Sequence, residues 1–277
     1  MASGRITLVG TAATLAIAAL LVFLVLPTVL VVPMAFGDQD HLAFPPRGLT
    51  WRWFSAFFSD PEWRAATWFS VKIAVLTTIA ATAIGTAASL AFVRGTLPGV
   101  SVINALALAP LIVPHIVVAI AMYLELAPLG LTGSTTGFVL AHTVLAVPYV
   151  VLTVSAALHR VDGALELAAL NLGASRLRAF TEVTLPLIAP GVAAGAAFAF
   201  IASFDEATVS FFISGVGNKT LTRKLFEDVD FNLTPVIAAA STVLVVVSLV
   251  LMSGAEFLRR MTQRRRRSFP TESRRLT

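Results

Sequence analysis

Residues 137–158 read GFVLAHTVLAVPYVVLTVSAAL, a run of 22 residues without a charged side chain. In an α-helix, about 20 apolar residues cross the roughly 30 Å hydrocarbon core of a bilayer, whereas a membrane β-strand needs about 9–11 residues of alternating polarity. The run does not alternate, and membrane helices tolerate a proline such as Pro148. This stretch therefore predicts a membrane-spanning helix.

Five further runs in the chain have the same apolar character. They lie at about Leu8–Pro33, Val71–Val93, Val100–Leu124, Leu187–Ile213 and Pro235–Phe257. The first is longer than the 7–15-residue apolar core of a secretory signal, so we expect a retained anchor. The sequence thus predicts an all-α membrane protein with six transmembrane helices.

The composition of the whole chain agrees with a membrane protein. Of its 277 residues, 57% are hydrophobic and 13% are charged, against about 25% charged in soluble domains. This balance excludes an ordinary soluble globular protein, a disordered chain and a collagen-like fibre. There is no cysteine, which excludes a disulfide framework, a thiolate metal site and a cysteine nucleophile, and we predict no metal site.

The basic residues predict the orientation in the membrane. If both termini are cytoplasmic, 13 of the 20 Lys and Arg residues lie inside, as the positive-inside rule requires. The chain is then a multi-pass membrane protein with both termini in the cytoplasm. The net charge of +5 does not indicate a nucleic-acid partner, because the basic residues gather at membrane boundaries and in a basic tail over 258–277. Arg264–Arg267 in this tail are expected to meet anionic lipid.

An aromatic-rich segment separates the first two runs. All four tryptophans lie there, at Trp51, Trp53, Trp63 and Trp68. Aromatic rings with a polar edge settle at the headgroup level of a membrane. Two interpretations remain open: a helix that lies along the outer surface, or a loop that packs on the helix bundle.

The loop over 159–186 is patterned as a helix, a turn and a second helix. Asp162 can cap the first helix, which we expect to run through Leu172, and Gly173 can end it where a positive φ is needed. Ser175 can cap a second short helix, which we expect to end near Val183 before Leu185 and Pro186 open the next span. The loop also shows apolar side chains, at Leu165, Leu167, Leu170, Leu172, Leu177 and Phe180. A solvated connector has no need of them, so the loop predicts docking to a cytoplasmic partner.

The same loop carries a family resemblance. Residues 165–175, LELAALNLGAS, followed by Thr184-Leu185-Pro186, resemble the EAA motif of permease subunits of type I ABC importers. The likeness extends over about 69–257. Stretches at 110–114 and 141–149 are also similar to this family. Short stretches at 203–206, 219–221 and 234–235 resemble the second permease of spermidine/putrescine-type importers. One departure is that Leu167 stands where the family has a glutamate, with Glu166 one position earlier.

This resemblance implies a permease of a bacterial cytoplasmic membrane that forms a solute path and is not itself an enzyme. It implies three parts: an anchor with an outer loop over 1–68, a permease core over 69–257 and the tail. The implied ATPase-coupling residues are Glu166, Leu167, Ala168, Ala169, Leu172, Gly173 and Ser175. The implied partners are a second permease, identical or homologous, two ATP-binding subunits, an extracytoplasmic solute-binding protein and the lipid bilayer. ATP and Mg would be bound by the ATPase subunits, so no cofactor is expected in this chain.

The residues present fit a nucleotide-binding protein, an intramembrane enzyme or a passive channel less well. Residues 215–220, GVGNKT, partly match a phosphate-binding loop, but Asn218 stands where that pattern requires glycine before the lysine. An intramembrane enzyme would need a clustered catalytic set, and we find no catalytic residues. A passive channel would not need the docking loop.

Four titratable residues in the apolar runs are candidates for the solute path. Asp205 and Glu206 either face the solute cavity or its outer gate, or they mark a helix end that sees water; a polyamine or another small organic solute would suit the carboxylates. His115 and His142 either face a polar cavity or bond backbone carbonyls freed by nearby prolines, and we favour the second interpretation for both. His115 is kept with Asp205 and Glu206 as a candidate path residue.

Overall fold

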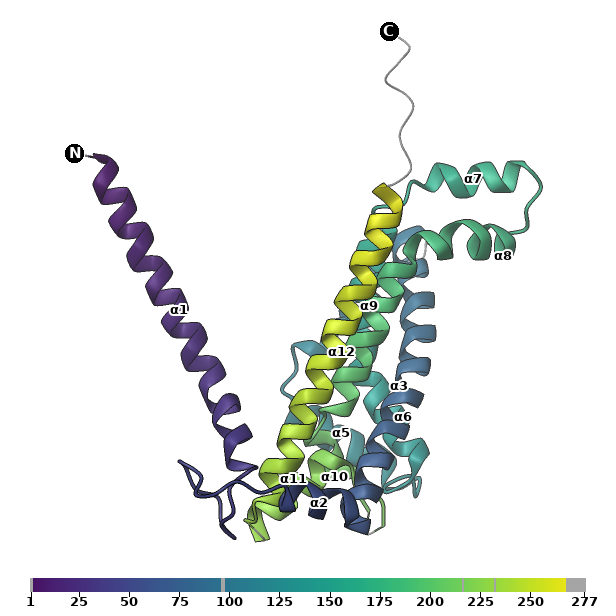
Figure 1. Cartoon of the computed structure of the whole chain (residues 1–277). Coiled ribbons are helices and arrows are strands. Elements are labelled where there is room, and N and C mark those ends of the chain that lie inside the picture. Colours follow the sequence, from purple (N-terminus) through teal and green to yellow (C-terminus); the bar gives the residue numbers. More distant parts are fainter. Residues whose placement is uncertain (1, 96–97, 216, 232, 268–277) are drawn as a thin grey trace. The chain divides into compact units, whose positions relative to one another are not determined.

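A computed structural model describes residues 2–95, 98–215, 217–231 and 233–267, and within these ranges the regular elements are all helices (Figure 1). The chain divides into two compact units. Unit 1 comprises Met1–Arg64 and Leu225–Val246, and unit 2 comprises Ala65–Lys224 and Val247–Thr277. Five helices in the described ranges are long and apolar enough to span a membrane, or six if one bent pair is a single span. The predicted all-α membrane fold is confirmed.

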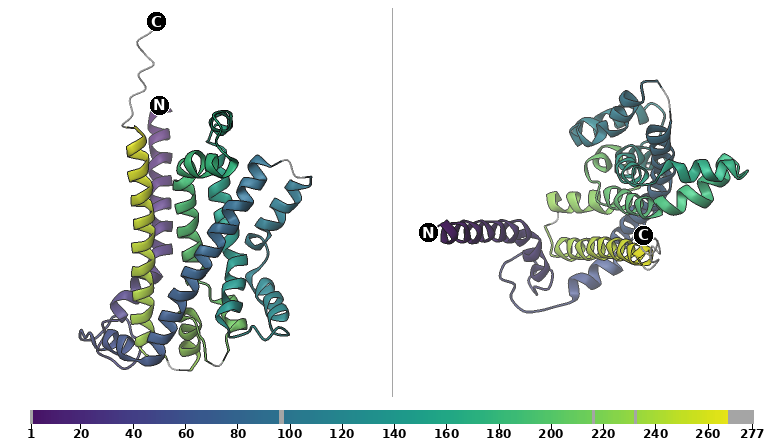
Figure 2. Two further views of the ribbon diagram at one scale, coloured as in Figure 1. Left: turned by 90° about the vertical axis from the view of Figure 1, so that its right-hand side faces the viewer. Right: turned by 90° about the horizontal axis from the view of Figure 1, so that it is seen from above.

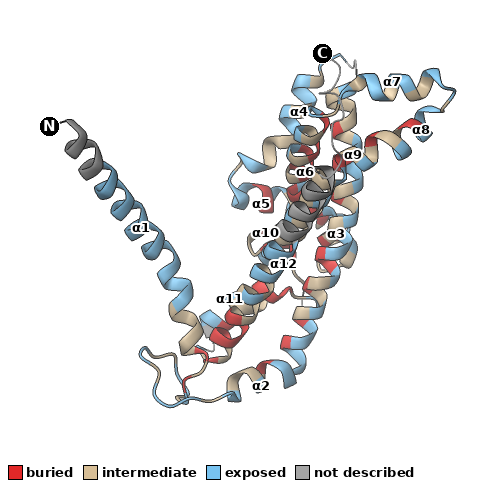
Figure 3. Ribbon diagram, turned by 45° about the horizontal axis from the view of Figure 1, so that its top comes forward, coloured by how far each residue is buried: buried red, intermediate tan, exposed pale blue. Residues whose placement is uncertain are grey.

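Unit 1 contains the first span and the aromatic-rich segment. Its elements are α1 (Ala2–Met34), α2 (Arg52–Ser59), the start of α3 (Pro61–Arg94), most of α11 (Leu221–Phe231) and the start of α12 (Val236–Arg267). Ala35, Ala238 and Ala239 form a small buried core in it. The side chains of α1 between 10 and 28 are exposed, as the pale blue ribbon in Figure 3 shows. A helix that is apolar all round and unburied by protein is typical of a lipid-facing span.

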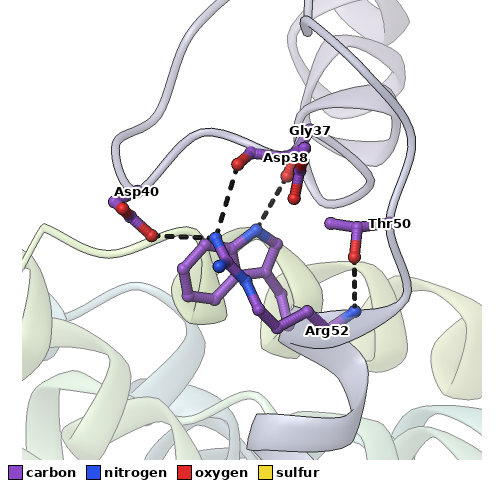
Figure 4. A network of polar contacts seen from close by, with 6 residues as sticks. Gly37, Asp38, Asp40, Thr50 and Arg52 are labelled. Carbon is purple, nitrogen blue, oxygen red and sulfur yellow. Dashed lines mark hydrogen bonds and ion pairs between the residues drawn. The ribbon is translucent and has the colours of Figure 1, made fainter.

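The segment between α1 and α2 is ordered by polar contacts (Figure 4). The Arg52 guanidinium donates to the Asp40 carboxylate at 2.8 Å and to the Asp38 carbonyl at 3.4 Å. The Trp53 indole N–H donates to the carbonyl of Gly37 at 2.8 Å. Trp51, in contrast, is 71% exposed. The segment thus packs partly on protein, through Trp53, and leaves the ring of Trp51 exposed.

Unit 2 contains the four predicted spans between Val71 and Ile213 and every candidate site residue. Its further elements are α4 (Val100–Leu108), the 3₁₀ turn η1 (Ala109–Leu111), α5 (His115–Leu126), α6 (Thr135–Leu158), α7 (Gly163–Asn171), α8 (Arg176–Ala179), the π-turn η2 (Phe180–Thr184), α9 (Leu185–Phe204) and α10 (Thr208–Ile213). Of the candidate spans, α6 is the most deeply buried in the chain. It is therefore the helix on which unit 2 is assembled.

Glycines allow neighbouring helices to approach α6 closely. A Cβ on Gly85 of α3 would lie 2.7 Å from Cβ of Val150, and a Cβ on Gly191 of α9 would lie 2.5 Å from Cβ of Ala157. Gly195, one turn after Gly191, packs against Val150 and Thr153. Helices in lipid gain no hydrophobic energy from associating, so close van der Waals contact at small residues stabilises the pair. Residues 191–195, GVAAG, have the spacing typical of such contacts.

Two predicted spans differ from the structure. The span predicted as Val100–Leu124 is bent by 103° between Leu111 and His115, since Pro114 has no N–H and cannot continue a helix. The span predicted as Leu187–Ile213 ends at Phe204, and α10 is a separate short helix. The fifth span opens at Leu185-Pro186 as predicted, because α9 begins there and proline is tolerated in the first turn of a helix. The preceding helix does not end near Val183, since the π-turn continues it into α9.

The contact at Gly195 can be tested by Gly195→Ala. The added methyl group would lie 2.5 Å from Oγ1 of Thr153 and 3.0 Å from Cα of Val150. We expect this overpacking to lower the free energy of unfolding in detergent by about 1–3 kcal/mol. Gly254→Ala is the matched control, because nothing lies within 4 Å of the methyl group it would add to α12. Equal stability of the two variants would contradict the packing described for α6 and α9.

Candidate functional site

The helical chain breaks between α9 and α10, at residues 205–207. Glu206 is only 6% exposed, and its Oε1 accepts a hydrogen bond of 2.8 Å from the backbone N–H of Val209. Its Oε2 lies 3.5 Å from Nδ1 of His115 on α5. The Thr222 hydroxyl donates to the Glu206 carbonyl at 3.0 Å. Glu206 therefore bonds the first turn of α10 and is held by three contacts, to Val209, His115 and Thr222.

Asp205, unlike its neighbour Glu206, is exposed. It lines a cavity of about 380 Å³. The other lining residues are Pro110, Leu111, His115, Leu145, Tyr149, Phe198, Ile201, Ala202, Glu206 and Thr208. The cavity thus brings together all three residues predicted for the solute path, although they come from two distant parts of the chain.

Sequence reasoning did not select the aromatic residues of this cavity. The rings of Tyr149 and Phe198 are stacked with centroids 6.4 Å apart. Tyr149 follows Pro148 in a stretch singled out for family likeness, but nothing in the sequence places it opposite Phe198. In such a cavity, a carboxylate can accept hydrogen bonds from a cationic group, while the aromatic rings pack against the carbon chain that carries it.

The two histidines differ in their surroundings. The side chain of His115 is half exposed and lies beside Glu206. His142 is buried, and its two ring nitrogens lie 2.9 Å from Oγ of Ser203 and 3.2 Å from Oγ of Ser210. His115 lines the cavity, as the first of the two interpretations expects, whereas the ring of His142 lies within hydrogen-bonding distance of two serine hydroxyl groups.

The second candidate site is the hairpin made by α7 and α8. Its predicted caps are confirmed: the backbone N–H of Ala164 donates to Asp162, and that of Arg178 donates to Ser175. Gly173 has φ +90°, as expected at the turn. Figures 1 and 2 show that the hairpin projects sideways from one end of unit 2.

The base of the hairpin is held by residues outside its turn. Arg94, the last residue of α3, donates to the carbonyl of Val161 at 2.7 Å. A Cβ on Gly163 would lie 2.7 Å from Nη1 of Arg94, so the guanidinium lies directly against the start of α7. Thr184 donates to Oε2 of Glu166 at 3.1 Å, which joins α7 to the π-turn. Glu166 therefore has a partner within the chain itself.

The predicted coupling residues divide into two groups. Those at the surface are Leu167, Ala168, Leu172, Gly173 and Ser175, while Glu166 and Ala169 are half-buried. Leu172 is 89% exposed at the turn, and Leu177 is 72% exposed. Leu170 and Phe180, predicted to be exposed, are half-buried, and Phe180 packs on the apolar cluster around Leu158. The hairpin thus presents an apolar tip on a base packed into unit 2.

Neither site has the residues of a metal centre. Within the described parts of the chain, no group of three or more His, Asp or Glu side chains is arranged to hold a metal ion. The His and acidic side chains near the cavity do not converge on one point where a metal ion could be bound.

Three comparisons relate the chain to known proteins. The family described as binding-protein-dependent transport system inner membrane component matches residues 83–267. The spermidine/putrescine transport system permease protein PotC of Haemophilus influenzae is 28% identical over 86% of this chain and 92% of its own length. The putrescine transport system permease protein PotI of Escherichia coli K12 is 30% identical over 80% and 81%. A crystal structure of a bacterial alginate ABC transporter with an alginate pentasaccharide-bound periplasmic protein shares the fold, with TM-score 0.69 and 16% identity over 93% of this chain and 96% of that one.

Proposed function

Because the chain belongs to the family of binding-protein-dependent transport system inner membrane components, and is thus a permease of a type I ABC importer rather than an enzyme, we propose that its cavity is part of the solute path. One observation carries this proposal: His115, Asp205 and Glu206 meet at one cavity beside a break in a membrane helix. Irregular backbone at membrane depth is tolerated where it lines a water-filled cavity.

We propose a polyamine or another small cationic organic solute. Asp205 offers an exposed carboxylate to the cavity, and Tyr149 and Phe198 offer aromatic faces. A charge-assisted hydrogen bond to Asp205 would stabilise an ammonium group, and the rings would pack against its alkyl chain. The names of the relatives PotC and PotI support a polyamine.

The hairpin is proposed to dock onto an ATP-binding subunit on the cytoplasmic side. Its support is the apolar tip around Leu172 and Leu177, which no residue of the chain covers among those described. We propose that two such ATPase subunits, which bind ATP and Mg, a second permease and an extracytoplasmic solute-binding protein complete the importer. Glu166 serves there to hold the hairpin together, since Thr184 already bonds it.

Both termini are proposed to be cytoplasmic. Support comes from the distribution of Lys and Arg, 13 of 20 inside. Much of the basic tail that dominates this distribution, residues 268–277, lies outside the described residues.

Cysteine labelling tests this orientation, because the natural chain has no cysteine. A Ser59→Cys variant should react with an impermeant maleimide in whole cells, since Ser59 is exposed in the proposed outer segment. A Ser273→Cys variant should react only after the cells are permeabilised. The reverse pattern would show that the termini lie outside.

Docking is tested by Gly173→Asp, which places a charge and a strained backbone at the hairpin turn. We expect solute-stimulated ATP hydrolysis by the purified complex to fall about tenfold, as for a loss of roughly 1.4 kcal/mol at the contact. Gly130→Asp is the matched control, because Gly130 also has positive φ, +66°, and open space around it, but lies in the loop between α5 and α6. If both variants hydrolyse ATP like the wild type, the hairpin turn does not couple the two subunits.

The solute path is tested by Asp205→Asn and Glu206→Gln, which remove a charge and keep the size. We expect Asp205→Asn to reduce uptake of radiolabelled putrescine and spermidine at least about tenfold, because a hydrogen bond to a charged group contributes about 1.5–3 kcal/mol. Glu206→Gln keeps an oxygen for the Val209 N–H and should have the smaller effect. Membrane assembly of the ATPase should be unchanged in both. Normal uptake by both variants and by the double variant would place the solute path elsewhere.

A further inference from the structure

One side chain of α6 reaches both sides of the break between α9 and α10. Nδ1 of His142 lies 2.9 Å from Oγ of Ser203, in the last turn of α9, and Nε2 lies 3.2 Å from Oγ of Ser210, in the first turn of α10. All three side chains are buried, with exposed fractions of 1%, 5% and 0%. The imidazole ring is therefore a bridge across the break.

The bridge can be satisfied without any charge. A neutral imidazole has one N–H donor and one acceptor nitrogen, and a serine hydroxyl can rotate to act as either donor or acceptor. Phe138, one turn earlier on α6, packs edge-on against the His142 ring at 5.8 Å between centroids and is itself fully buried. The orientation of the ring is thus fixed by its packing as well as by its two hydroxyl partners.

The backbone of the break needs such support. Residues 205–207 lie outside both helices, so the end of α9 and the start of α10 are not joined by a continuous helical ladder. Glu206 restrains α10 locally through the Val209 N–H, and Thr222 restrains the Glu206 carbonyl. α10 packs on α6 through Val209 and Ile213, which share an apolar cluster with Phe138. His142 adds a polar contact from α6, the most buried candidate span, to both α9 and α10.

We propose that His142 is a positioning residue of the solute path: by joining Ser203 to Ser210, it fixes α10 relative to α9 and so sets where the Asp205 carboxylate lies in the cavity. Asp205 is two residues after Ser203 and three before Thr208. Thr208 is the first residue of α10 and lines the cavity. The role of Asp205 in this proposal rests on the proposed function, whereas the bridge itself is a property of the fold.

The bridge is tested by the reactivity of a single cysteine at Thr208, in the purified complex with its ATPase and second permease. With His142→Leu, which removes both ring nitrogens, we expect the rate of reaction of Thr208→Cys with a charged methanethiosulfonate to rise about tenfold, because α10 loses its hydrogen bond to α6. A cysteine at Leu49, which is 85% exposed in unit 1, should react at an unchanged rate.

The matched control is Thr143→Val, at the next residue of α6. Thr143 is also buried, and its hydroxyl has no hydrogen-bond partner among the described residues, so its loss releases nothing. An equal reaction rate in the His142→Leu and Thr143→Val backgrounds would overturn the proposal.

A second set of variants keeps the test valid if His142→Leu does not fold. Ser203→Ala and Ser210→Ala each remove one end of the bridge, and His142→Gln keeps an amide donor and acceptor. We expect each serine variant to raise the reactivity of Thr208→Cys, and His142→Gln to restore part of the wild-type rate. In a double-mutant cycle, Ser210→Ala should have a smaller effect in the His142→Gln background than in the wild type, because the two residues share one contact. Fully additive effects would show that the ring and the serine act separately.

Transport separates positioning from a purely structural role. In His142→Gln, we expect the apparent KM for putrescine uptake to rise about tenfold, with the maximal rate per assembled complex nearly unchanged. A fall in maximal rate alone, proportional to the amount of folded complex, would overturn the positioning role. If Asp205→Asn transports normally, the proposed solute path fails, yet the cysteine reactivity still decides whether His142 holds α10.

Discussion

Unit 2 depends on the close approach of α3 and α9 to α6. Val150 of α6 lies between Gly85 on one neighbour and Gly195 on the other, and neither site has space for a Cβ. In lipid, such contact stabilises a helix pair that the hydrophobic effect does not. Because α9 is held along α6 by Gly191 and Gly195, its last turn arrives beside His142, and the cavity residues Tyr149 and Phe198 stack. The geometry of the candidate solute path follows from this packing.

The candidate path is built where regular helix stops. Pro114 bends the third apolar stretch and begins α5 with His115, while α9 ends at Phe204 and leaves Asp205 and Glu206 outside any helix. Broken helices expose backbone groups, which must be bonded by side chains or water. Glu206 does so for α10, which explains why one of two adjacent carboxylates is buried and the other is free to face the cavity. Glu206 therefore stabilises the start of α10, while Asp205 lines the cavity with an exposed carboxylate.

The hairpin is joined to the membrane helices by polar contacts at its base. Arg94 connects the end of α3 to the carbonyl of Val161, and Glu166 connects α7 to Thr184 in the π-turn that leads into α9. A π-turn inside a helix often marks a functional position. Displacement of the hairpin tip by a partner would thus act on α3 and α9 together, the two helices that pack on α6. This arrangement also gives Glu166 a role that does not require an ion pair with another subunit.

The apolar runs by themselves determined the all-α membrane class, because only a helix satisfies its own backbone over such a length in lipid. The hairpin caps at Asp162 and Ser175 and the turn at Gly173 could also be predicted, since each depends on residues within a few positions along the chain. Tertiary structure alone decided which polar groups meet. His142 and Ser210 are 68 residues apart in the chain, and His115 and Glu206 are further apart still. Their pairing depends on where α9 packs along α6 and on the bend at Pro114. Residues close together in the sequence do not determine either of these long-range arrangements.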